Sequence, residues 1–359
     1  MRVLIDGYFL NKKRGLGRYV QELLYVLGNY PDSDIELYVL VPQGLQHSYI
    51  FEGVHRYVHY KKLPFPLWEQ FVVPLIAGRI CANVVHFPYN SKALVYNFLS
   101  VCNVVTVHDL IFLDKSNVLG GGLYHTLGDL YRRIIIKMMS LKKTRILTVS
   151  EESQEMIRVM LGCDSDVAYT STEYLHAQTS STCHRRAGPY VFHVGGASPH
   201  KNTVRVIRAF LESNLFEYQL VIAGVSHHSN LRAQFESDRI VFLDNVSDQE
   251  IASEYAFAKC VLFPSLREGY GLPILEAFMF SVPVVTSNIA PMSEIASNAA
   301  VLVDPESVDS IRDGLIRVLN SSELARELVT RGHERLKCIN GYEMARQTIS
   351  TYKRAIEGS

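Results

Sequence analysis

The amino-acid sequence predicts an α/β fold made of two doubly wound domains. The chain has 359 residues, a length that suits two domains of ordinary size better than a single core. Short runs of Val, Ile and Leu recur along it, separated by segments of helical period. Strands that are apolar throughout and alternate with helices are typical of parallel sheets covered on both faces. The runs form two series, which indicates two separate sheets.

Five apolar runs in the first half predict the strands of an N-terminal domain, which we assign to residues 1–175. The runs are Val3–Ile5, Ile35–Val41, Val84–Phe87, Val101–Val107 and Ile146–Val149. A polar stretch follows at His176–Pro189, and its end, Arg-Arg-Ala-Gly-Pro, has the composition of a linker. The break between the two domains is therefore expected in that stretch.

Six further runs predict the strands of a C-terminal domain, which we assign to residues 188–341. They are Tyr190–Val194, Leu220–Ala223, Ile240–Leu243, Cys260–Phe263, Val282–Thr286 and Ala300–Val303. The final segment, Gly341–Ile356, has helical character. Ligands of such sheets bind beyond the carboxyl ends of the strands, so the cleft between the domains is the expected site.

The composition indicates a soluble protein of a reducing compartment. No run of eighteen apolar residues is present, so we expect no transmembrane helix. Met1–Gly7 predicts a short strand that ends in a turn, not a signal peptide. The six cysteines are scattered without a CxxC pair, which indicates reduced thiols and no zinc site. We therefore expect a cytoplasmic protein.

Charge is distributed unevenly along the chain. Residues 1–150 hold 17 lysines and arginines against 10 aspartates and glutamates, whereas residues 151–359 hold 19 against 26. A basic N-terminal half suggests contact with an anionic partner, either a membrane surface or a phosphate-bearing acceptor. Basic and apolar residues mix at near-helical spacing in Tyr131–Arg145. This segment could lie against anionic lipid or be a packed helix with a basic outer face; its basic residues include Arg132, Arg133, Lys137, Lys142 and Lys143.

A glycine-bracketed loop follows the Cys260–Phe263 run and is the most informative feature of the sequence. It reads Glu-Gly-Tyr-Gly-Leu at 268–272 and opens a helix whose first residue is expected to be Pro273. The free backbone amides at such a helix start bind anions, and glycine lets a phosphate approach the chain closely. A carboxylate would repel phosphate, so Glu276 is expected to accept hydrogen bonds from a ribose and Glu268 to face a sugar. Taken alone, the two glutamates could also be a solvated loop residue and a carboxylate stabilised by the helix dipole.

This segment resembles the E-x7-E motif of retaining GT-B glycosyltransferases of family four, also called group 1, which includes many bacterial mannosyltransferases. The resemblance covers nearly the whole chain, with its specific core in residues 192–203 and 263–305. It implies a GT-B fold with an interdomain cleft, retention of anomeric configuration and no need for a metal. It also implies that a C-terminal helix, residues 342–359, packs back on the N-terminal domain, with Tyr342 as a looser match to the usual aromatic at its start.

A second motif follows the first strand of the C-terminal domain. Gly195 and Gly196 permit a tight turn, and Lys201 is a point charge suited to a diphosphate. Asn202 or Thr203 could cap the next helix. The segment is similar to the family's Gly…Pro-Arg-Lys-Asn loop, but His200 stands where arginine is usual, so its contribution should be weaker and pH-sensitive. A solvated lysine at a helix start and an ordinary surface histidine are the simpler alternatives.

The N-terminal domain carries three weaker motifs. Gly15 and Gly17 precede an amphipathic helix and could be an ordinary tight turn or a loop that approaches the donor or acceptor. His108 ends a strand, and the resemblance suggests that it contacts the transferred sugar while Asp109 holds its ring. It could instead be a histidine that is hydrogen-bonded at a strand end. Trp68, in Trp-Glu-Gln, matches a family subgroup and is placed near the acceptor.

The motifs and the resemblance together predict a glycosyltransferase that passes a sugar from a nucleotide-diphosphate donor to a glycan hydroxyl. The subgroup motifs Trp68-Glu69-Gln70 and His108-Asp109 favour mannose from GDP-mannose, with rhamnose or N-acetylglucosamine donors as the alternatives. The resemblance alone implies the acceptor, a lipid-linked intermediate of a bacterial surface polysaccharide such as O-antigen or capsule, met at the inner face of the cytoplasmic membrane. We expect no cofactor beyond the nucleotide sugar, no metal and no nucleic-acid partner. The catalytic candidates are Glu268, Lys201 and His108. The donor side comprises Glu276, Gly196, His200, Lys201, Gly269, Tyr270, Gly271 and Leu272, and the acceptor side Gly15, Gly17, Asp109 and Trp68.

Two other functions stay open at this level. Another GT-B activity, such as a sugar-nucleotide epimerase or a phosphorylase, would use a similar fold. A phosphorylase would bind pyridoxal phosphate through a lysine and show its absorbance. A non-catalytic sugar-nucleotide-binding scaffold is the alternative from a different class, and His200 in the place of arginine is its only hint.

Overall fold

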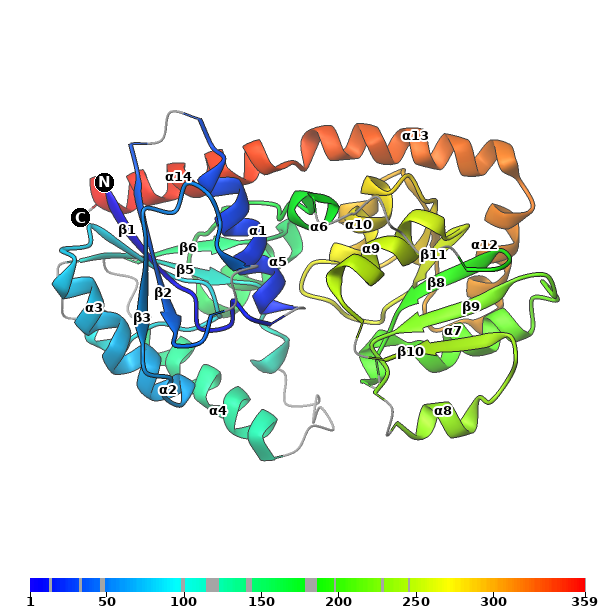
Figure 1. Ribbon diagram of the computed structural model, residues 1–359, viewed down its shortest axis with the longest axis horizontal. Helices are drawn as coiled ribbons and strands as arrows, with labels where there is room; N and C mark the ends of the chain where they lie inside the picture. Colours follow the sequence, from blue (N-terminus) through cyan, green and yellow to red (C-terminus); the bar gives the residue numbers. More distant parts are fainter. Residues whose placement is uncertain are drawn as a thin grey trace. The chain divides into compact units, whose positions relative to one another are not determined.

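The computed structural model divides the chain into two compact units. It describes residues 1–358 except 13–14, 32–33, 46–48, 98–100, 114–122, 140–143, 178–185, 197, 227–228 and 245, and the side chains of 123–127 and 129. The first unit comprises Met1–Ser171 and Gly341–Ser359, and the second comprises Thr172–Asn340. Each unit has its own parallel sheet with helices packed against it (Figure 1).

The first unit contains a seven-stranded parallel sheet in the order β3-β2-β1-β4-β5-β6-β7. Its five central strands match the five predicted apolar runs. The two edge strands were not predicted, because one is exposed or half-exposed along its length with few aliphatic residues and the other has only two residues. The strands are β1 (Arg2–Asp6), β2 (Glu36–Pro42), β3 (Arg56–Tyr60), β4 (Val84–Phe87), β5 (Cys102–Val107), β6 (Thr144–Thr148) and β7 (Asp166–Val167).

The helices of the first unit cover this sheet and follow local signals. Ser150 caps the start of α5, since its side chain accepts a hydrogen bond from the Ser153 amide, and Gly162 ends that helix in the left-handed conformation. The helical segments are α1 (Leu16–Gly28), α2 (Phe65–Leu67), η2 (Trp68–Val72), α3 (Val73–Arg79), η3 (Leu94–Asn97), η4 (Ile111–Leu113), α4 (Leu123–Met138), α5 (Glu151–Leu161) and α14 (Gly341–Glu357).

The second unit contains a six-stranded parallel sheet in the order β10-β9-β8-β11-β12-β13, and all six strands were predicted. They are β8 (Tyr190–Val194), β9 (Gln219–Ala223), β10 (Ile240–Leu243), β11 (Cys260–Phe263), β12 (Val284–Ser287) and β13 (Ala300–Val303). The helical segments are α6 (Glu173–Ala177), η5 (Pro199–Lys201), α7 (Thr203–Leu211), α8 (Asn230–Gln234), α9 (Asp248–Phe257), α10 (Leu272–Met279), α11 (Met292–Ala296), α12 (Val308–Leu319) and α13 (Ser322–Cys338).

The boundary between the units lies slightly earlier than the sequence suggested. The chain passes from one unit to the other at Ser171 and Thr172, because the short helix α6 contacts α10 and α9 of the second unit. At its other end the second unit stops at Asn340. Helix α14 contacts α1, β5 and β6, so the last segment belongs to the first unit.

The outer face of α4 differs from the basic face that the sequence suggested. The guanidinium of Arg132 lies 5.7 Å from the centre of the Phe112 ring, and Arg133 Nε donates to the Phe112 carbonyl. Lys142 and Lys143 lie outside the described residues. Among the three basic residues that the structure describes here, Arg132 and Arg133 are partly buried and Lys137 is exposed. Across the described residues, no helix is long and apolar enough to cross a bilayer.

Candidate active site

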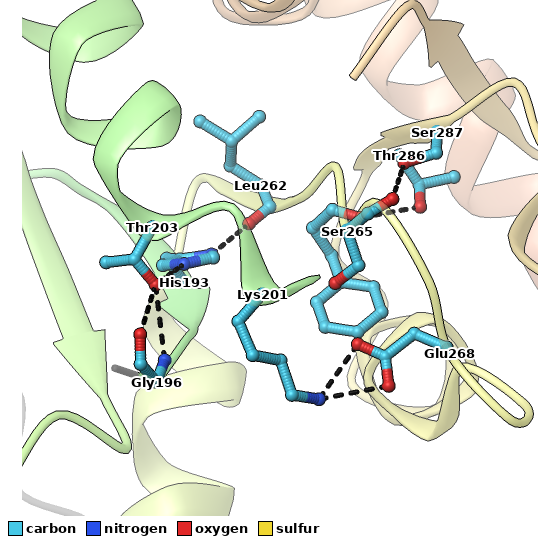
Figure 2. A network of polar contacts seen from close by, with 10 residues as sticks. His193, Gly196, Lys201, Thr203, Leu262, Ser265, Glu268, Thr286 and Ser287 are labelled. Atoms are coloured by element: carbon cyan, nitrogen blue, oxygen red, sulfur yellow. Dashed lines mark hydrogen bonds and ion pairs between the residues drawn. The ribbon is translucent and has the colours of Figure 1, made fainter. Parts of the chain in front are cut away.

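The second unit brings Lys201 and Glu268 together at the carboxyl ends of its central strands. Lys201 follows β8 and Glu268 follows β11, and these neighbouring strands lie where the chain reverses direction across the sheet, the usual ligand position in such folds. Lys201 Nζ lies 2.8 and 3.0 Å from the two carboxylate oxygens (Figure 2). Both side chains are partly buried, so the ion pair is less screened than a surface pair.

The Gly195–Gly196 turn is held tightly beside this pair. A Cβ on Gly195 would lie 2.7 Å from both His193 Nε2 and Thr203 Oγ1, so only glycine fits there. The Thr203 hydroxyl bridges the peptide groups of Gly196, accepting from its N–H at 3.2 Å and donating to its carbonyl at 3.0 Å. Thr203 therefore sets the conformation of the turn that precedes Lys201.

His193 lies beneath that turn and was not identified from the sequence. Its Nδ1 lies 2.8 Å from the Leu262 carbonyl on β11, and its Nε2 lies 3.1 Å from Thr203 Oγ1 (Figure 2). Burial lowers the pKa of His193 to about 4, so the ring is neutral at pH 7. The ring thus ties the turn after β8 to the strand that carries Glu268. A histidine inside an apolar strand gives no local signal of such a role.

Asn202 also links separate loops, although the sequence suggested only a helix cap. It precedes α7 in the left-handed conformation with φ of 58°, and its side chain makes no capping bond. Instead Nδ2 donates to the Pro264 carbonyl at 2.8 Å and to the Pro305 carbonyl at 2.7 Å. Asn202 therefore fastens the loops after β11 and β13 to the segment of Lys201.

His200 is half-buried, and burial lowers the pKa of its ring. A neutral imidazole at pH 7 supplies no full charge, in contrast to the arginine usual at this position. Its backbone carbonyl accepts from the Leu266 amide at 2.8 Å, which joins the two loops once more.

The loop after β11 opens helix α10 as the glycine pattern predicted. Gly271 has φ of 114°, which a residue with a side chain rarely adopts, and α10 begins at Leu272. Pro273 is thus the second helical residue, one position later than expected. Tyr270 is largely buried, whereas Gly269 is partly exposed. The first amides of the helix lie directly beyond Glu268 in the chain.

Glu276 lies in the second turn of α10 and is only 8% exposed. The buried hydroxyl of Tyr255 donates to its Oε2 at 2.6 Å, and the Tyr255 ring stacks on Phe280 with 5.8 Å between centroids. This support fixes the orientation of the carboxylate. Tyr255 was missed in the sequence because it lies on α9, a different helix.

In the first unit, the ring of His108 is oriented so that Nε2 donates a hydrogen bond and Nδ1 can accept one. Its Nε2 lies 2.9 Å from the Pro88 carbonyl, and because a carbonyl only accepts, we assign the proton to Nε2. Burial lowers the pKa to about 4, so Nδ1 keeps its lone pair at pH 7. The expectation that Asp109 holds the ring needs correction, since Pro88 does so and Asp109 Oδ1 accepts from the Ile111 amide at 3.0 Å.

The structure favours glycine at Gly15 and at Gly17 for different reasons. Gly15 precedes α1 with φ of 59° and open space around it, so its backbone conformation calls for glycine. At Gly17 a Cβ would lie 2.2 Å from the Lys12 carbonyl. Gly17 therefore allows close packing within the turn, whereas the position of a Cβ on Gly15 is free of neighbouring atoms.

Trp68 is fully buried, so its own side chain does not contact an acceptor directly, and its place near the acceptor side stays a prediction. Its Nε1 donates to Asp6 Oδ1 at 2.9 Å, at the carboxyl end of β1. The neighbouring Glu69 is also fully buried and accepts from the hydroxyls of Ser91 at 2.6 Å and Tyr131 at 2.5 Å. Burial raises the pKa of Asp6 to about 7 and that of Glu69 to about 8.

These raised pKa values predict a pH-dependent stability of the first unit. Folded Glu69 keeps a proton up to about pH 8, while the unfolded chain releases it near its ordinary value of 4.5. The folded state then binds more protons, so the unfolding free energy should fall between pH 6.5 and 8 by up to about 1.4 kcal/mol per pH unit for this group. Glu69→Gln, which mimics the protonated acid, should flatten the fall. Urea unfolding followed by fluorescence of Trp68, the single tryptophan, measures it.

The matched comparison is between the slopes of unfolding free energy against pH for the wild type and Glu69→Gln over the same pH range. Asp6 remains in both, so the difference between the wild-type and variant curves reports the titration of Glu69 together with its electrostatic interaction with Asp6. Parallel curves would contradict the assignment of a protonated Glu69.

Within the described residues, no group of three or more His, Cys, Asp or Glu side chains is arranged to hold a metal ion. Lys201 Nζ is a cation in contact with Glu268, and the backbone amides at the start of α10 follow Glu268 in the chain.

The two parallel-sheet units define a class of protein, the GT-B fold. Sucrose-phosphate synthase from Thermosynechococcus elongatus superposes with a TM-score of 0.75 at 15% identity, over 100% of both chains. At this identity the likeness concerns the fold alone.

Residues 181–335, which are less than half of the chain, match the model of the glycosyl transferases group 1. O-antigen chain mannosyltransferase B of Escherichia coli is 27% identical over 239 residues, which are 64% of this chain and 59% of that protein. O-antigen chain mannosyltransferase RfbU of Salmonella typhimurium is 28% identical over 192 residues, 50% of this chain and 52% of that protein. The matches thus span little more than half the length of these curated relatives.

Proposed function

We propose that the protein is a glycosyltransferase that moves a sugar from a nucleotide-diphosphate donor to a glycan hydroxyl. The observation that carries the proposal is the Lys201–Glu268 pair, set beside the amides that start α10. A cation and a helix start bind the diphosphate, and a carboxylate next to them binds sugar hydroxyls. This combination suits a sugar nucleotide better than either a free sugar or a free nucleotide.

The residues divide the chemistry between them. The diphosphate displaces Glu268 from Lys201, which then stabilises the negative charge of the departing nucleotide. Glu268, released from the lysine, turns to the donor sugar, and Glu276 accepts from the ribose hydroxyls. His108 Nδ1 accepts from a hydroxyl of the transferred sugar. Following the resemblance, the reaction retains anomeric configuration, and the departing phosphate takes the proton of the acceptor hydroxyl as the new glycosidic bond forms. It needs no metal, because lysine and helix amides meet the diphosphate charge.

The names of two relatives support the choice of sugar. The Escherichia coli and Salmonella typhimurium proteins are named O-antigen chain mannosyltransferases, which supports mannose as the transferred sugar. The donor that we propose for it is GDP-mannose. The acceptor is a lipid-linked glycan of bacterial surface polysaccharide synthesis. Such an acceptor places the enzyme at the inner face of the cytoplasmic membrane, without a span of its own.

A screen of nucleotide sugars by thermal unfolding tests the proposal. A ligand that binds the native state stabilises it by about 2.7 kcal/mol at 100 times its Kd. GDP-mannose should therefore raise the Tm of the protein more than UDP-glucose or GDP does at the same concentration. Transfer to a lipid-linked acceptor should then follow and survive EDTA. A preference for a uridine donor would overturn the mannose assignment, and stabilisation without transfer to any acceptor would indicate a binding scaffold instead.

A further inference from the structure

The outward side of one helical segment in the first unit is apolar. Residues 65–79 run through α2, η2 and α3, and every fourth side chain on the solvent side is a large hydrophobe, namely Leu67, Phe71 and Leu75. Phe71 leaves 67% of its surface exposed. The opposite side of the same segment is buried in the core, through Trp68, Val72, Val73, Ile76 and Ala77. The solvent side of an ordinary surface helix would be polar.

Helix α4 repeats this pattern. Leu130, Ile134 and Met138 follow each other at the same spacing, and Met138 is 57% exposed. Ile135 and Ile136 are buried on the inward side. Two helical segments with the same unusual outward side indicate a surface built for an apolar environment.

The two segments are neighbours in the first unit (Figure 1). Gln70 Nε2 donates to Tyr131 Oη on α4 at 2.7 Å. The short helix η3 lies beside the end of α4, because Asn97 Nδ2 donates to the Met138 carbonyl at 3.0 Å. Val95 of η3 is also exposed. The apolar face therefore consists of Leu67, Phe71, Leu75, Val95, Leu130, Ile134 and Met138.

The exposed charged side chains of residues 61–79 and 130–138 are all cations. Lys61 and Lys62 lie just before α2, Arg79 ends α3 and Lys137 lies near the end of α4. The acid within these two ranges is Glu69, which is buried in the core. Exposed hydrophobes accompanied by cations complement a surface of anionic headgroups over hydrocarbon.

We propose that the apolar face docks on the surface of an anionic lipid bilayer. Its hydrophobic side chains enter the boundary between headgroups and acyl chains, and the four cations meet the lipid phosphates. The proposal rests on the proposed function in one respect, since a lipid-linked acceptor is presented at such a surface.

Vesicle flotation with the full-length protein tests the surface. At low salt the wild type should float with phosphatidylglycerol vesicles and not with phosphatidylcholine vesicles. Phe71→Ser combined with Ile134→Ser should lower the bound fraction at least tenfold, and Arg79→Gln combined with Lys137→Gln should weaken binding and its dependence on salt. The matched control is Phe216→Ser in the second unit, where the side chain is 72% exposed and the change should leave binding unaltered.

The outcomes separate this inference from the proposed function. Vesicle binding is measured without donor or acceptor. If the protein binds vesicles but transfers no sugar, the docking surface is supported and the proposed function is wrong. Transfer to a water-soluble acceptor analogue should be equal in the wild type and the Phe71→Ser, Ile134→Ser variant. Wild-type binding to neither vesicle, or equal binding by that variant with an unchanged Tm, would overturn the proposal. A wild-type dimer that the variant makes monomeric, without vesicle binding, would show a protein interface instead.

Discussion

Lys201→Ala is expected to lower kcat by about 10²–10³-fold, which is the usual loss when one group that stabilises transition-state charge is removed. Lys201 Nζ is the cation within 3.0 Å of both Glu268 oxygens, next to the proposed diphosphate position. The negative charge on the leaving nucleotide grows as the glycosidic bond breaks, so the lysine should matter more for kcat than for the donor KM. Steady-state transfer kinetics with varied donor measure the two constants.

Glu268→Gln is the matched control for that prediction. It removes the carboxylate charge that Lys201 now holds but leaves the lysine in place. Donor affinity should be equal to or higher than that of the wild type, because the diphosphate no longer competes with Glu268, while transfer should fall if Glu268 contacts the sugar. A Lys201→Ala loss confined to KM would mean that the lysine binds ground state and transition state equally.

Glu276→Ala should weaken nucleotide binding by about 2–4 kcal/mol, the cost of losing two hydrogen bonds to a charged acceptor. Its carboxylate is largely buried and held by the Tyr255 hydroxyl, so it is preorganised and loses little freedom on binding. Isothermal titration with GDP, and with the 2′-deoxy analogue, measures the affinity. The analogue should bind the wild type less tightly than GDP but bind Glu276→Ala equally.

Tyr255→Phe separates direct contact from support. This change removes the 2.6 Å hydrogen bond to Glu276 and leaves the carboxylate itself. Its effect on GDP affinity should therefore be smaller than that of Glu276→Ala. Unaltered affinity in Glu276→Ala would refute the ribose assignment, and equal losses in both variants would assign Glu276 to packing against α9.

The candidate residues of the second unit could be found from the sequence because their local signals are strong. Gly271 needs a backbone conformation that glycine favours, Pro273 suits a helix start, and the preceding apolar run predicts a buried strand. The same local reasoning did not show the surroundings of Trp68, because its Trp-Glu-Gln motif contains no sign that the indole is buried against Asp6. It also failed for Arg132 and Arg133, because their partner Phe112 is distant in the sequence.

The sequence by itself determined the two parallel sheets, all the central strands, the glycine-rich loop with Glu268 and Glu276, and the separate motif that contains Lys201. These features depend on residue periodicity and on the backbone preferences of glycine and proline, which act over a few neighbouring residues. Only the tertiary structure decided which side chains meet. Lys201 and Glu268 are 67 residues apart and come together because β8 and β11 pair in one sheet. Burial likewise made His108 a neutral acceptor and kept Glu69 protonated, since a pKa depends on the surroundings that folding creates.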